Sequence, residues 1–411
     1  MTSPSSQREF ALQVARQLRS AGYEAFWAGG CVRDQLLGLT PKDYDIATSA
    51  RPEQVRELFG KRRTLAIGAA FGVIAVQSQR CDPIEVATFR SDGAYVDGRR
   101  PESVVYTTAE EDAQRRDFTI NGMFFDPIEE QVIDFVGGEV DLKQGIVRAI
   151  GDPSSRFAED KLRLLRAVRF ATTFGFRIEE RTLAAIRTMA SEVTVISAER
   201  IGMELRRMLV HPARSAAVEL LRETGLLDAL LPELVALPKD PAWSGTLEYL
   251  ERLKTDSLPV ALALLLVQLN GPLQTREIGR RFRFTNKEID RAAWLVEMLP
   301  SVRDACELMW PTLQRSLVHQ GASDLLSLGE AVFGADHPGV VECYRRMALP
   351  TEQLNPEPLV GGDELVAHGL RPGPHFAELL DYLRDEQLEG RLSTASEAMA
   401  MADQWIREHQ D

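Results

Sequence analysis

Cysteine is scarce in this chain of 411 residues, which contains only Cys31, Cys81, Cys306 and Cys343. The four lie far apart in the sequence and form no CxxC pair. This spacing argues against a disulfide framework and against a cysteine-based zinc site. Free cysteines are typical of a reducing compartment, so the expected location is cytoplasmic.

Long apolar segments are also missing. The longest, Leu258–Leu269, contains Pro259 and is too short to cross a bilayer, which takes about 20 residues. We expect a buried core helix there. The first ten residues are polar and lack the apolar centre of a signal peptide, so no membrane partner is expected.

Positive charge is in deficit, because the formal net charge of the chain is -13. A uniformly basic coat for nucleic acid is therefore excluded. Residues 151–215 nevertheless hold 12 Lys and Arg against 8 Asp and Glu. An acidic protein with one basic segment is typical of a polyanion bound at one defined place.

The chain is long enough for more than one domain, and its character changes near Asp152. Residues 1–150 alternate short strand-like runs with helical ones, whereas almost everything that follows has a helical period. Expected strands in the first part cover 23–28, 64–67, 72–78, 84–89, 120–125 and 131–135, with one more carrying Asp43 and Asp45. Pro-bearing breaks near Leu237–Pro241, Met298–Ser301 and Leu349–Pro358 mark candidate boundaries within the helical part.

The most informative stretch runs from Gly29-Gly30 to Lys42-Asp43-Tyr44-Asp45. The glycines let the backbone approach a ligand at the start of a short helix, where free N–H groups attract anions. Asp43 and Asp45 would project from one face of a strand and hold one or two Mg²⁺ ions for phosphoryl chemistry. Glu85 is a candidate third carboxylate. The alternative is a plain turn followed by solvated acids.

A second group lies between Glu159 and Phe170, which reads as one amphipathic helix. Asp160 and Arg163 are i,i+3 neighbours on its polar side. A carboxylate only accepts hydrogen bonds and a guanidinium only donates them. The pair would match the amino donor and ring acceptor of cytosine or adenine, and refuse uracil and guanine, by roughly 1–3 kcal/mol. The alternative is a helix whose charges merely face solvent.

Two further arginines of that helix, Arg166 and Arg169, could hold phosphates or an RNA backbone. Arg115–Gly122 is a basic corner before an expected strand, and its Arg116 is a candidate triphosphate or ribose contact. Residues 90–101 are rich in Gly, Asp and Arg and predict a long functional loop.

Together these motifs closely resemble the class II tRNA nucleotidyltransferase and bacterial poly(A) polymerase family, a branch of the polymerase-β-like nucleotidyltransferases. The chain is similar to it over nearly its whole length. The matching segments are the metal motif at Gly29–Asp45, RRDFTINA at Arg115–Gly122 (with Gly122 for Ala), EDxxRxxRxxRF at Glu159–Phe170, Glu199–Glu204 and the stretch Leu359–Phe376.

The resemblance implies an α/β nucleotidyltransferase head at 1–150, followed by an all-helical neck (151–215), body (216–300) and tail (301–411) in a seahorse-like arrangement. It implies addition of C, C and A to tRNA 3′ ends from CTP and ATP without a nucleic-acid template, and with Mg²⁺. The body and tail would hold the acceptor stem and elbow of tRNA, and DNA is not an expected partner. The residues it assigns are Asp43 and Asp45 for catalysis and metal, and Gly30, Arg33, Arg116, Asp160, Arg163, Arg166 and Arg169 for the nucleotide.

Three alternatives remain at this point. Poly(A) polymerases of the family carry a basic Gly-Arg-Arg-Phe where this chain has Gly68-Ala69-Ala70-Phe71-Gly72, which favours tRNA over poly(A) synthesis. An enzyme that adds only A could keep every motif. An inactive RNA-binding protein of the same fold would be expected to have lost an aspartate of the pair, and both are present.

Overall fold

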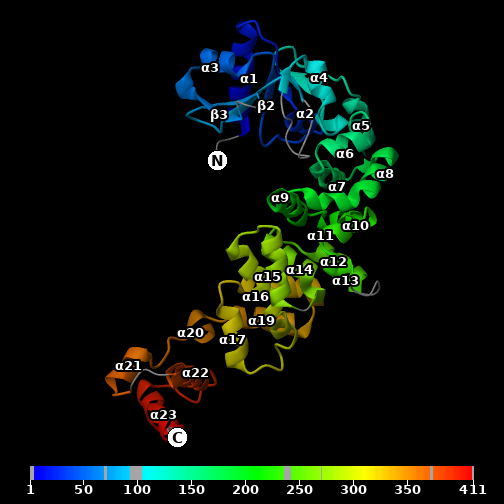
Figure 1. The fold of residues 1–411 in the computed structure, drawn as a ribbon. Coiled ribbons are helices and arrows are strands. Elements are labelled where there is room, and N and C mark those ends of the chain that lie inside the picture. The colour runs from blue at the N-terminus through cyan, green and yellow to red at the C-terminus, as the bar shows by residue number, and fades with distance from the viewer. Residues whose placement is uncertain are drawn as a thin grey trace. The chain divides into compact units, whose positions relative to one another are not determined.

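The computed structural model describes residues 4–68, 72–92, 104–235, 242–269, 271–370 and 374–409. The chain divides into two compact units, Met1–Ala236 and Leu237–Asp411, whose elements are labelled in Figure 1. Every described strand belongs to the first unit, and the described elements of the second are helices.

The first unit is built on a seven-stranded mixed sheet in the order β3-β4-β5-β2-β1-β8-β9. Only β2 and β5 pair in parallel; the other neighbours are antiparallel. The strands are β1 (Ala25–Ala28), β2 (Asp45–Thr48), β3 (Thr64–Gly68), β4 (Val73–Val76), β5 (Ile84–Thr88), β8 (Phe124–Asp126) and β9 (Gln131–Ile133). A separate hairpin pairs β6 (Arg90–Asp92) with β7 (Val104–Tyr106).

The two faces of this sheet are covered by different helices. Trp27 of β1 lies under Arg8 of α1 (Pro4–Ser20), at 5.3 Å from the guanidinium carbon to the ring. The neighbouring residues Phe26 and Ala28 point the other way and pack with Ala113 of α4 (Ala109–Gln114). Helix α1 therefore covers one face and α4 the other.

Several expected elements are confirmed and some boundaries are corrected. Helix α3 spans Pro52–Phe59, and its first residue is a proline, which is favoured in the first turn of a helix. Strand β2 begins at Asp45, so Asp43 precedes the strand and is not part of it. The strand expected at 120–125 is instead a 3₁₀ turn, Thr119–Asn121, followed by β8. Buried polar contacts favour that turn, because the Thr119 hydroxyl donates to Asp141 at 2.7 Å.

The part of the first unit after the sheet is mainly helical, with one addition that periodicity did not reveal. Strand β10 (Ile146–Val147) pairs in parallel with β11 (Arg177–Ile178). The other elements are α2 (Gly30–Leu36), α5 (Gly138–Gln144), α6 (Pro153–Glu159), α7 (Leu162–Phe174), α8 (Glu180–Met189), α9 (Ala198–Leu209), α10 (Arg214–Glu223), α11 (Leu226–Leu230) and α12 (Pro232–Val235), with 3₁₀ turns at Lys61–Arg63 (η1) and Ala190–Val195.

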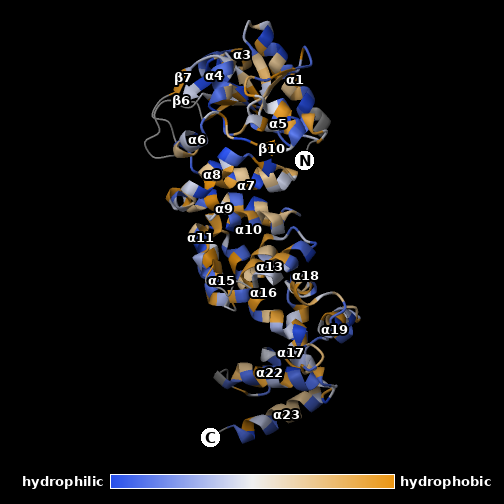
Figure 2. Cartoon of the chain, turned by 90° about the vertical axis from the view of Figure 1, so that its right-hand side faces the viewer, coloured by the Kyte–Doolittle hydropathy of each residue, from blue (hydrophilic) through white to orange (hydrophobic). Residues whose placement is uncertain are grey.

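The second unit consists of helices around a core that includes α14 (Leu258–Leu266), which is buried as predicted. Thr285 and Glu288 form a capping box at the start of α16. Figure 2 shows apolar and polar residues interleaved along these helices, as packing of amphipathic helices requires. The others are α13 (Ala242–Arg252), α15 (Pro272–Arg281), α16 (Asn286–Arg303), α17 (Trp310–Val318), α18 (Ala322–Phe333), α19 (Pro338–Met347), α20 (Thr351–Leu354), α21 (Gly362–Ala367), α22 (Pro374–Leu388) and α23 (Ala395–Glu408).

Parts of three sequence predictions lie outside the described residues. They are residues 93–101 of the expected loop, residues 69–71 of the Gly68–Gly72 segment, and residues 371–373 of the tail motif. Within the described part of the chain, no helix combines the length and the apolar character that a membrane crossing needs.

Candidate active site

The glycine turn between β1 and α2 brings an arginine to the backbone. Gly29 has φ 71, and a Cβ on it would lie 3.1 Å from Nη1 of Arg116. Its N–H donates to the Met123 carbonyl at 3.3 Å, which fixes the turn against the 3₁₀ segment and β8. Gly29 is therefore needed both for its backbone angles and for the close approach of Arg116.

Three carboxylates gather at the start of β2, on the sheet face that α4 covers. Asp45 lies directly opposite Glu85 in the parallel register of β2 and β5, and Asp43 is two residues upstream. All three residues are exposed to solvent. The structure thus places the predicted third carboxylate, Glu85, next to Asp45.

Crowding of negative charge makes this cluster receptive to a cation. Desolvation by the surrounding protein, together with repulsion from Glu85 and Asp43, raises the pKa of Asp45 to about 6, although the positive charge of Arg116 opposes the rise. Among the described residues, no three His, Cys, Asp or Glu side chains form a complete metal-binding group. A divalent metal at Asp43 and Asp45 would therefore need additional oxygen ligands, which a nucleotide's phosphates can provide.

Arg116 is held at the turn by a buried acid. Its Nε and Nη2 donate to Oδ2 of Asp112, at 3.2 and 3.0 Å, and its guanidinium lies over the Phe124 ring at 5.0 Å. Burial would raise the pKa of Asp112, but the adjacent arginines, Arg116 and Arg115, outweigh it and lower the pKa below the ordinary value. Asp112 is therefore ionised and keeps Arg116 in place.

Arg33 of α2 is buried, with 8% of its surface exposed. Its guanidinium donates to Asp34 and, at 2.6 Å, to the Asn121 side chain. It also lies over the Phe170 and Phe174 rings of α7, at 5.2 and 4.5 Å. Arg33 thus joins the glycine turn to the helix that carries the second predicted motif.

The same amide continues the connection into α7. Asn121 Nδ2 donates to Oδ1 of Asp117 at 3.2 Å, and Arg166 Nε donates to Oδ2 of Asp117 at 2.8 Å. Burial would raise the pKa of Asp117, but Arg166 lowers it to about 2 by charge and hydrogen bonding. A chain of hydrogen bonds therefore runs from Arg33 through Asn121 and Asp117 to Arg166.

A single buried carboxylate, Glu204 of α9, gathers the remaining arginines. Arg169 Nε donates to it at 2.5 Å, Arg207 Nη1 lies 3.1 Å away and Arg166 Nη1 4.0 Å away. Only 2% of Glu204 is exposed. With Asp117, which also pairs with Arg166, two negative charges face three positive ones. The group therefore keeps a net positive charge that an anion could neutralise.

The structure does not bring Asp160 and Arg163 together as a direct pair, and it corrects the expected continuous helix. Asp160 caps the end of α6 in an extended conformation and α7 begins at Leu162. Asp160 Oδ2 accepts from Arg200 at 2.7 Å. Arg163 is buried and donates to Glu159 at 2.6 Å.

Four residues that hydrogen-bond to the predicted site residues were assigned no role from the sequence. They are Asp112, Asn121, Arg200 and Glu204. Glu204 and Arg200 belong to a motif that was noticed without a function. Their partners lie 35 and 40 residues away in the chain, so no local spacing could identify them. Asp112 is three and four residues before Arg115 and Arg116, and helical spacing could have suggested that contact.

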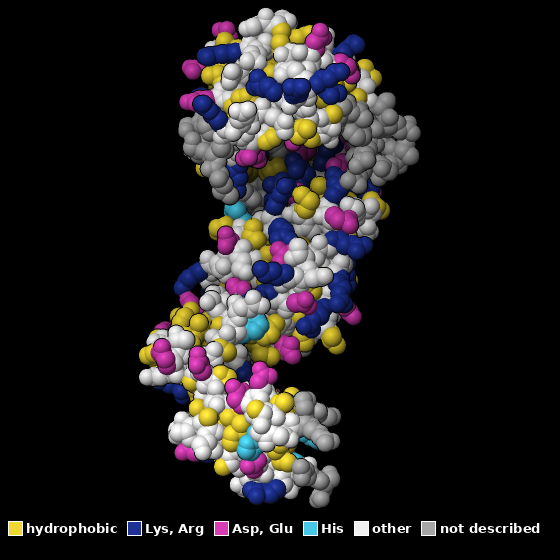
Figure 3. Space-filling model, turned by 90° about the vertical axis from the view of Figure 1, so that its left-hand side faces the viewer, with side chains coloured by type: hydrophobic (Ala, Val, Ile, Leu, Met, Phe, Trp, Pro, Cys, Tyr) yellow, Lys and Arg dark blue, Asp and Glu magenta, His cyan; other side chains and the backbone are white. Residues whose placement is uncertain are grey.

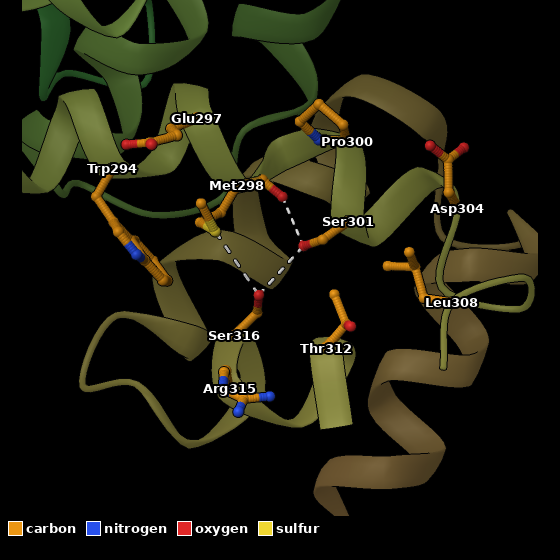
Figure 4. A pocket seen from close by; sticks show the side chains of 10 residues that line it. All are labelled: Trp294, Glu297, Met298, Pro300, Ser301, Asp304, Leu308, Thr312, Arg315 and Ser316. Carbon is orange, nitrogen blue, oxygen red and sulfur yellow. Dashed lines mark hydrogen bonds between the residues drawn. The ribbon is translucent and has the colours of Figure 1, made fainter. Parts of the chain in front are cut away.

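The second unit has a recess of about 500 Å³ between α16 and α17, shown in Figure 4. Ser301 donates to the Met298 carbonyl at 2.7 Å and lies 3.4 Å from the Ser316 hydroxyl. The acids that line it, Glu297 and Asp304, stand beside no glycine turn. This recess therefore lacks the features that make the first unit a catalytic candidate.

A mixed sheet with adjacent carboxylates, a glycine turn and a helix of buried arginines defines the first unit as a polymerase-β-like nucleotidyltransferase. Comparison with known proteins agrees. Residues 25–148 match the poly A polymerase head domain, and residues 175–237 match the family described as a probable RNA and SrmB-binding site of polymerase A.

Relatives that match over nearly the whole length of the chain identify its family within this class. The CCA-adding enzyme of Geobacillus kaustophilus is 37% identical over 386 residues, which are 91% of each chain. The crystal structure of the Bacillus stearothermophilus CCA-adding enzyme in complex with CTP is 30% identical and matches with a TM-score of 0.80 over 100% of both chains. The Thermotoga maritima CCA-adding enzyme complexed with tRNA, 20% identical with a TM-score of 0.69 over 97% and 95% of the chains, shares the fold. This chain belongs to the CCA-adding enzymes, which are tRNA nucleotidyltransferases.

Proposed function

We propose that this protein adds C, C and A to the 3′ end of tRNA, using CTP and ATP and releasing pyrophosphate. The observation that carries the proposal is the pairing of Asp45 with Glu85 beside the turn at Gly29 and Arg116. This arrangement places accessible carboxylates beside the positively charged Arg116 at a backbone turn, and nucleotidyl transfer requires that combination.

We further propose that Asp43 and Asp45 hold Mg²⁺. Both carboxylates are accessible. The raised pKa of Asp45 reflects desolvation first and then repulsion by Glu85 and Asp43, and a bound cation would stabilise the ionised carboxylate against both. When bound, the metal neutralises charge on the phosphates and activates the primer's 3′-hydroxyl. Glu85 adds negative charge beside Asp45 and strengthens the attraction for the cation.

The triphosphate would lie along the glycine turn. Gly30 leaves space there, and Nη2 of Arg33 stands 3.6 Å from the position that a Cβ on Gly30 would occupy. Arg116 approaches the same turn from the other side. Because Asp112 and Asn121 orient these two guanidinium groups, the donors are in place before the nucleotide arrives.

The base would be read by Asp160 and Arg163 through their unused hydrogen-bonding capacity. Asp160 accepts from Leu162 N and Arg200, which leaves lone pairs for an exocyclic amino group. Arg163 makes three hydrogen bonds with its five N–H donors, to Arg156, Glu159 and Arg115. Its remaining donors suit the unprotonated ring nitrogen of cytosine or adenine.

Arg166 and Arg169 would stabilise the nucleotide and the primer end through the positive excess around Glu204. The tRNA acceptor stem and elbow would contact the helices of the body (216–300) and tail (301–411) by shape and backbone contacts. A substrate of this kind and four unpaired cysteines support a cytoplasmic location.

The deciding experiment supplies tRNA that lacks its terminal CCA with CTP alone, ATP alone, both nucleotides, UTP or GTP. We expect two C residues with CTP, complete CCA with both, and no incorporation of U or G. Incorporation of A without any C would contradict the proposal and favour an A-adding enzyme or a poly(A) polymerase. No incorporation at all would favour an inactive RNA-binding protein.

The metal assignment has a matched control in the same domain. Asp45→Ala should abolish incorporation at every Mg²⁺ concentration. Asp82→Ala removes an exposed carboxylate outside the cluster and should leave incorporation unchanged. Full activity of Asp45→Ala or Asp43→Ala would contradict a metal role for the pair.

A further inference from the structure

A basic surface of the head lies away from the catalytic carboxylates. It comprises Lys61, Arg62 and Arg63 of η1 and Arg80, which follows β4; all four residues are exposed. Figure 3 shows a band of Lys and Arg side chains across the head, on the side that carries α3 and β3 in Figure 1. In a protein with formal net charge -13, such a concentration of positive charge needs an explanation.

These cations are not neutralised by neighbouring acids. Across the described residues, none of the four takes part in an ion pair. Asp82 follows Arg80 by two residues and makes no ion pair with it. Arg56, one helical turn before the group, also leaves its Nε without a hydrogen-bond partner. The surface is therefore available to an external anion.

The arginines border a real recess. It measures about 570 Å³ and is lined by Phe10, Gln13, Arg62, Arg63, Gln77, Ser78, Gln79 and Arg80. Three glutamine amides can each donate and accept hydrogen bonds, whereas the arginines only donate. The lining contains no carboxylate.

The backbone that carries this recess is well ordered by hydrogen bonds. Gln77 N donates to the Arg63 carbonyl at 2.8 Å, and Arg63 N donates to the Gly60 carbonyl at 3.0 Å. Arg80 N donates to the Ser78 hydroxyl at 3.1 Å. Both basic segments are thus fixed relative to each other, which lowers the entropy lost when a ligand binds.

The recess is separate from the nucleotide site. Phe10 and Gln13 belong to α1, which covers the Trp27 face of the sheet. Asp45 is the register partner of Ala28 and points to the opposite face, where α4 packs. A ligand in the recess would therefore not occupy the place of the primer's 3′ end.

We propose that this surface, the head recess, binds single-stranded RNA, with backbone phosphates on Arg62, Arg63 and Arg80 and one nucleotide lodged among the glutamines. Arginine forks match phosphate oxygens, and amide side chains can meet the donor and acceptor edges of a base. The enzyme would then hold RNA at a second place, independently of the acceptor end under synthesis.

The test uses a fluorescent single-stranded oligouridylate of twelve nucleotides and the full-length protein, titrated at several salt concentrations. We expect R62Q/R63Q/R80Q to weaken binding at least tenfold and to reduce the slope of log affinity against log salt by about 2, since each phosphate contact contributes about 0.7 for single strands. Lys143→Gln removes one charge elsewhere on the head, from a residue paired with Glu139, and should change neither value.

Two further measurements make the result decisive. CTP incorporation at saturating tRNA should be unchanged in R62Q/R63Q/R80Q, which also shows that the variant is folded; parallel loss of incorporation would place these arginines in the substrate path and overturn a separate site. A 4-thiouridine oligonucleotide should crosslink to the peptides that contain Phe10 or Gln77. Unchanged oligonucleotide affinity, or complete displacement by inorganic tripolyphosphate at equal phosphate concentration, would overturn RNA as the ligand.

Discussion

Arg166 and Asp117 form an ion pair in which Nη2 and Oδ2 are 2.7 Å apart. The arginine belongs to α7 and the aspartate to the corner that precedes the Thr119–Asn121 turn, 49 residues earlier. Through Asn121, this contact ties α7, which carries part of the proposed base reader, to the turn that is proposed to carry the triphosphate.

We predict that Asp117→Asn destabilises the first unit by about 1–3 kcal/mol at neutral pH, because it leaves Arg166 without its charged partner. The native pKa of about 2 lies below the ordinary value of 3.8. The stabilisation is therefore fully present above pH 3.8 and is lost as the pH falls toward 2. Urea unfolding of both proteins between pH 7 and pH 3 measures it, and an equal free energy of unfolding at pH 7 would refute the pair's role.

Asp45→Asn should separate stability from activity. The native pKa of Asp45, about 6, lies above the ordinary value of 3.8, so the ionised carboxylate opposes folding in the absence of metal. The variant should melt at a higher temperature than the parent above pH 6, and this difference should shrink as the pH falls from 6 to below 4. Nucleotide incorporation should be lost.

Asp82→Asn is the control for that experiment and should alter neither melting temperature nor incorporation. Mg²⁺ should raise the melting temperature of the parent protein and not that of Asp45→Asn. Equal stabilisation of both by Mg²⁺ would show that the metal binds elsewhere.

If Asp45 holds the metal as proposed, incorporation by the parent protein should itself fall as the pH drops below about 6, because protonation of Asp45 would remove a metal ligand. Higher Mg²⁺ competes with the proton and should move the midpoint to lower pH. Rates measured from pH 5 to pH 8 at several Mg²⁺ concentrations test this. A midpoint that is independent of Mg²⁺ would contradict it.

Gly29→Ala should reduce incorporation more than its effect on stability explains. Its φ of 71 strains any side chain, at a cost of about 1–3 kcal/mol, and the new Cβ would press on Arg116. Gly38→Ala is the matched control, because the φ of Gly38 is 73 and no atom lies within 4 Å of the added Cβ. Both variants should lose stability, and only Gly29→Ala should show a raised KM for nucleotide.

Arg200→Ala should relax the choice of nucleotide, since Asp160 loses the cation that orients its carboxylate. Lys161→Ala removes a neighbouring ion pair of the same length, with Glu192, and should keep selectivity. Competition of CTP with UTP during incorporation measures the ratio of kcat/KM values. Equal selectivity of the two variants would mean that Arg200 does not position the base reader.

Local signals predicted much of the fold. Pro52 marks the start of α3, and Thr285 with Glu288 marks that of α16, because caps and first-turn prolines act within four residues. The 3₁₀ turn at Thr119–Asn121 was not predicted, because the hydrogen bond from the Thr119 hydroxyl to Asp141 joins residues that are 22 positions apart in the sequence. Tertiary polar contacts overrode the apolar pattern of Ile120–Phe125.

Residue types at the candidate site could be predicted, but their partners could not. Asp43 and Asp45 could be predicted from their two-residue spacing, and Glu85 from its place on another expected strand of the head. The motif around Asp160 was visible as a cluster of charge. Whether Asp160 faces Arg163 or Arg200 depends on how α6, α7 and α9 pack, and the helix break at Asp160 decides it.

The parallel pairing of β10 with β11 bears on how this enzyme can be dissected. Arg177 N donates to the Gly145 carbonyl at 2.9 Å and Glu179 N to the Val147 carbonyl at 3.0 Å. A fragment ending at residue 150 would leave Ile146 and Val147 as a bare apolar edge, prone to aggregation. The sheet and the arginine-bearing helices are therefore expected to fold as one unit. The smallest fragment expected to survive proteolysis extends through the first unit, to about residue 236.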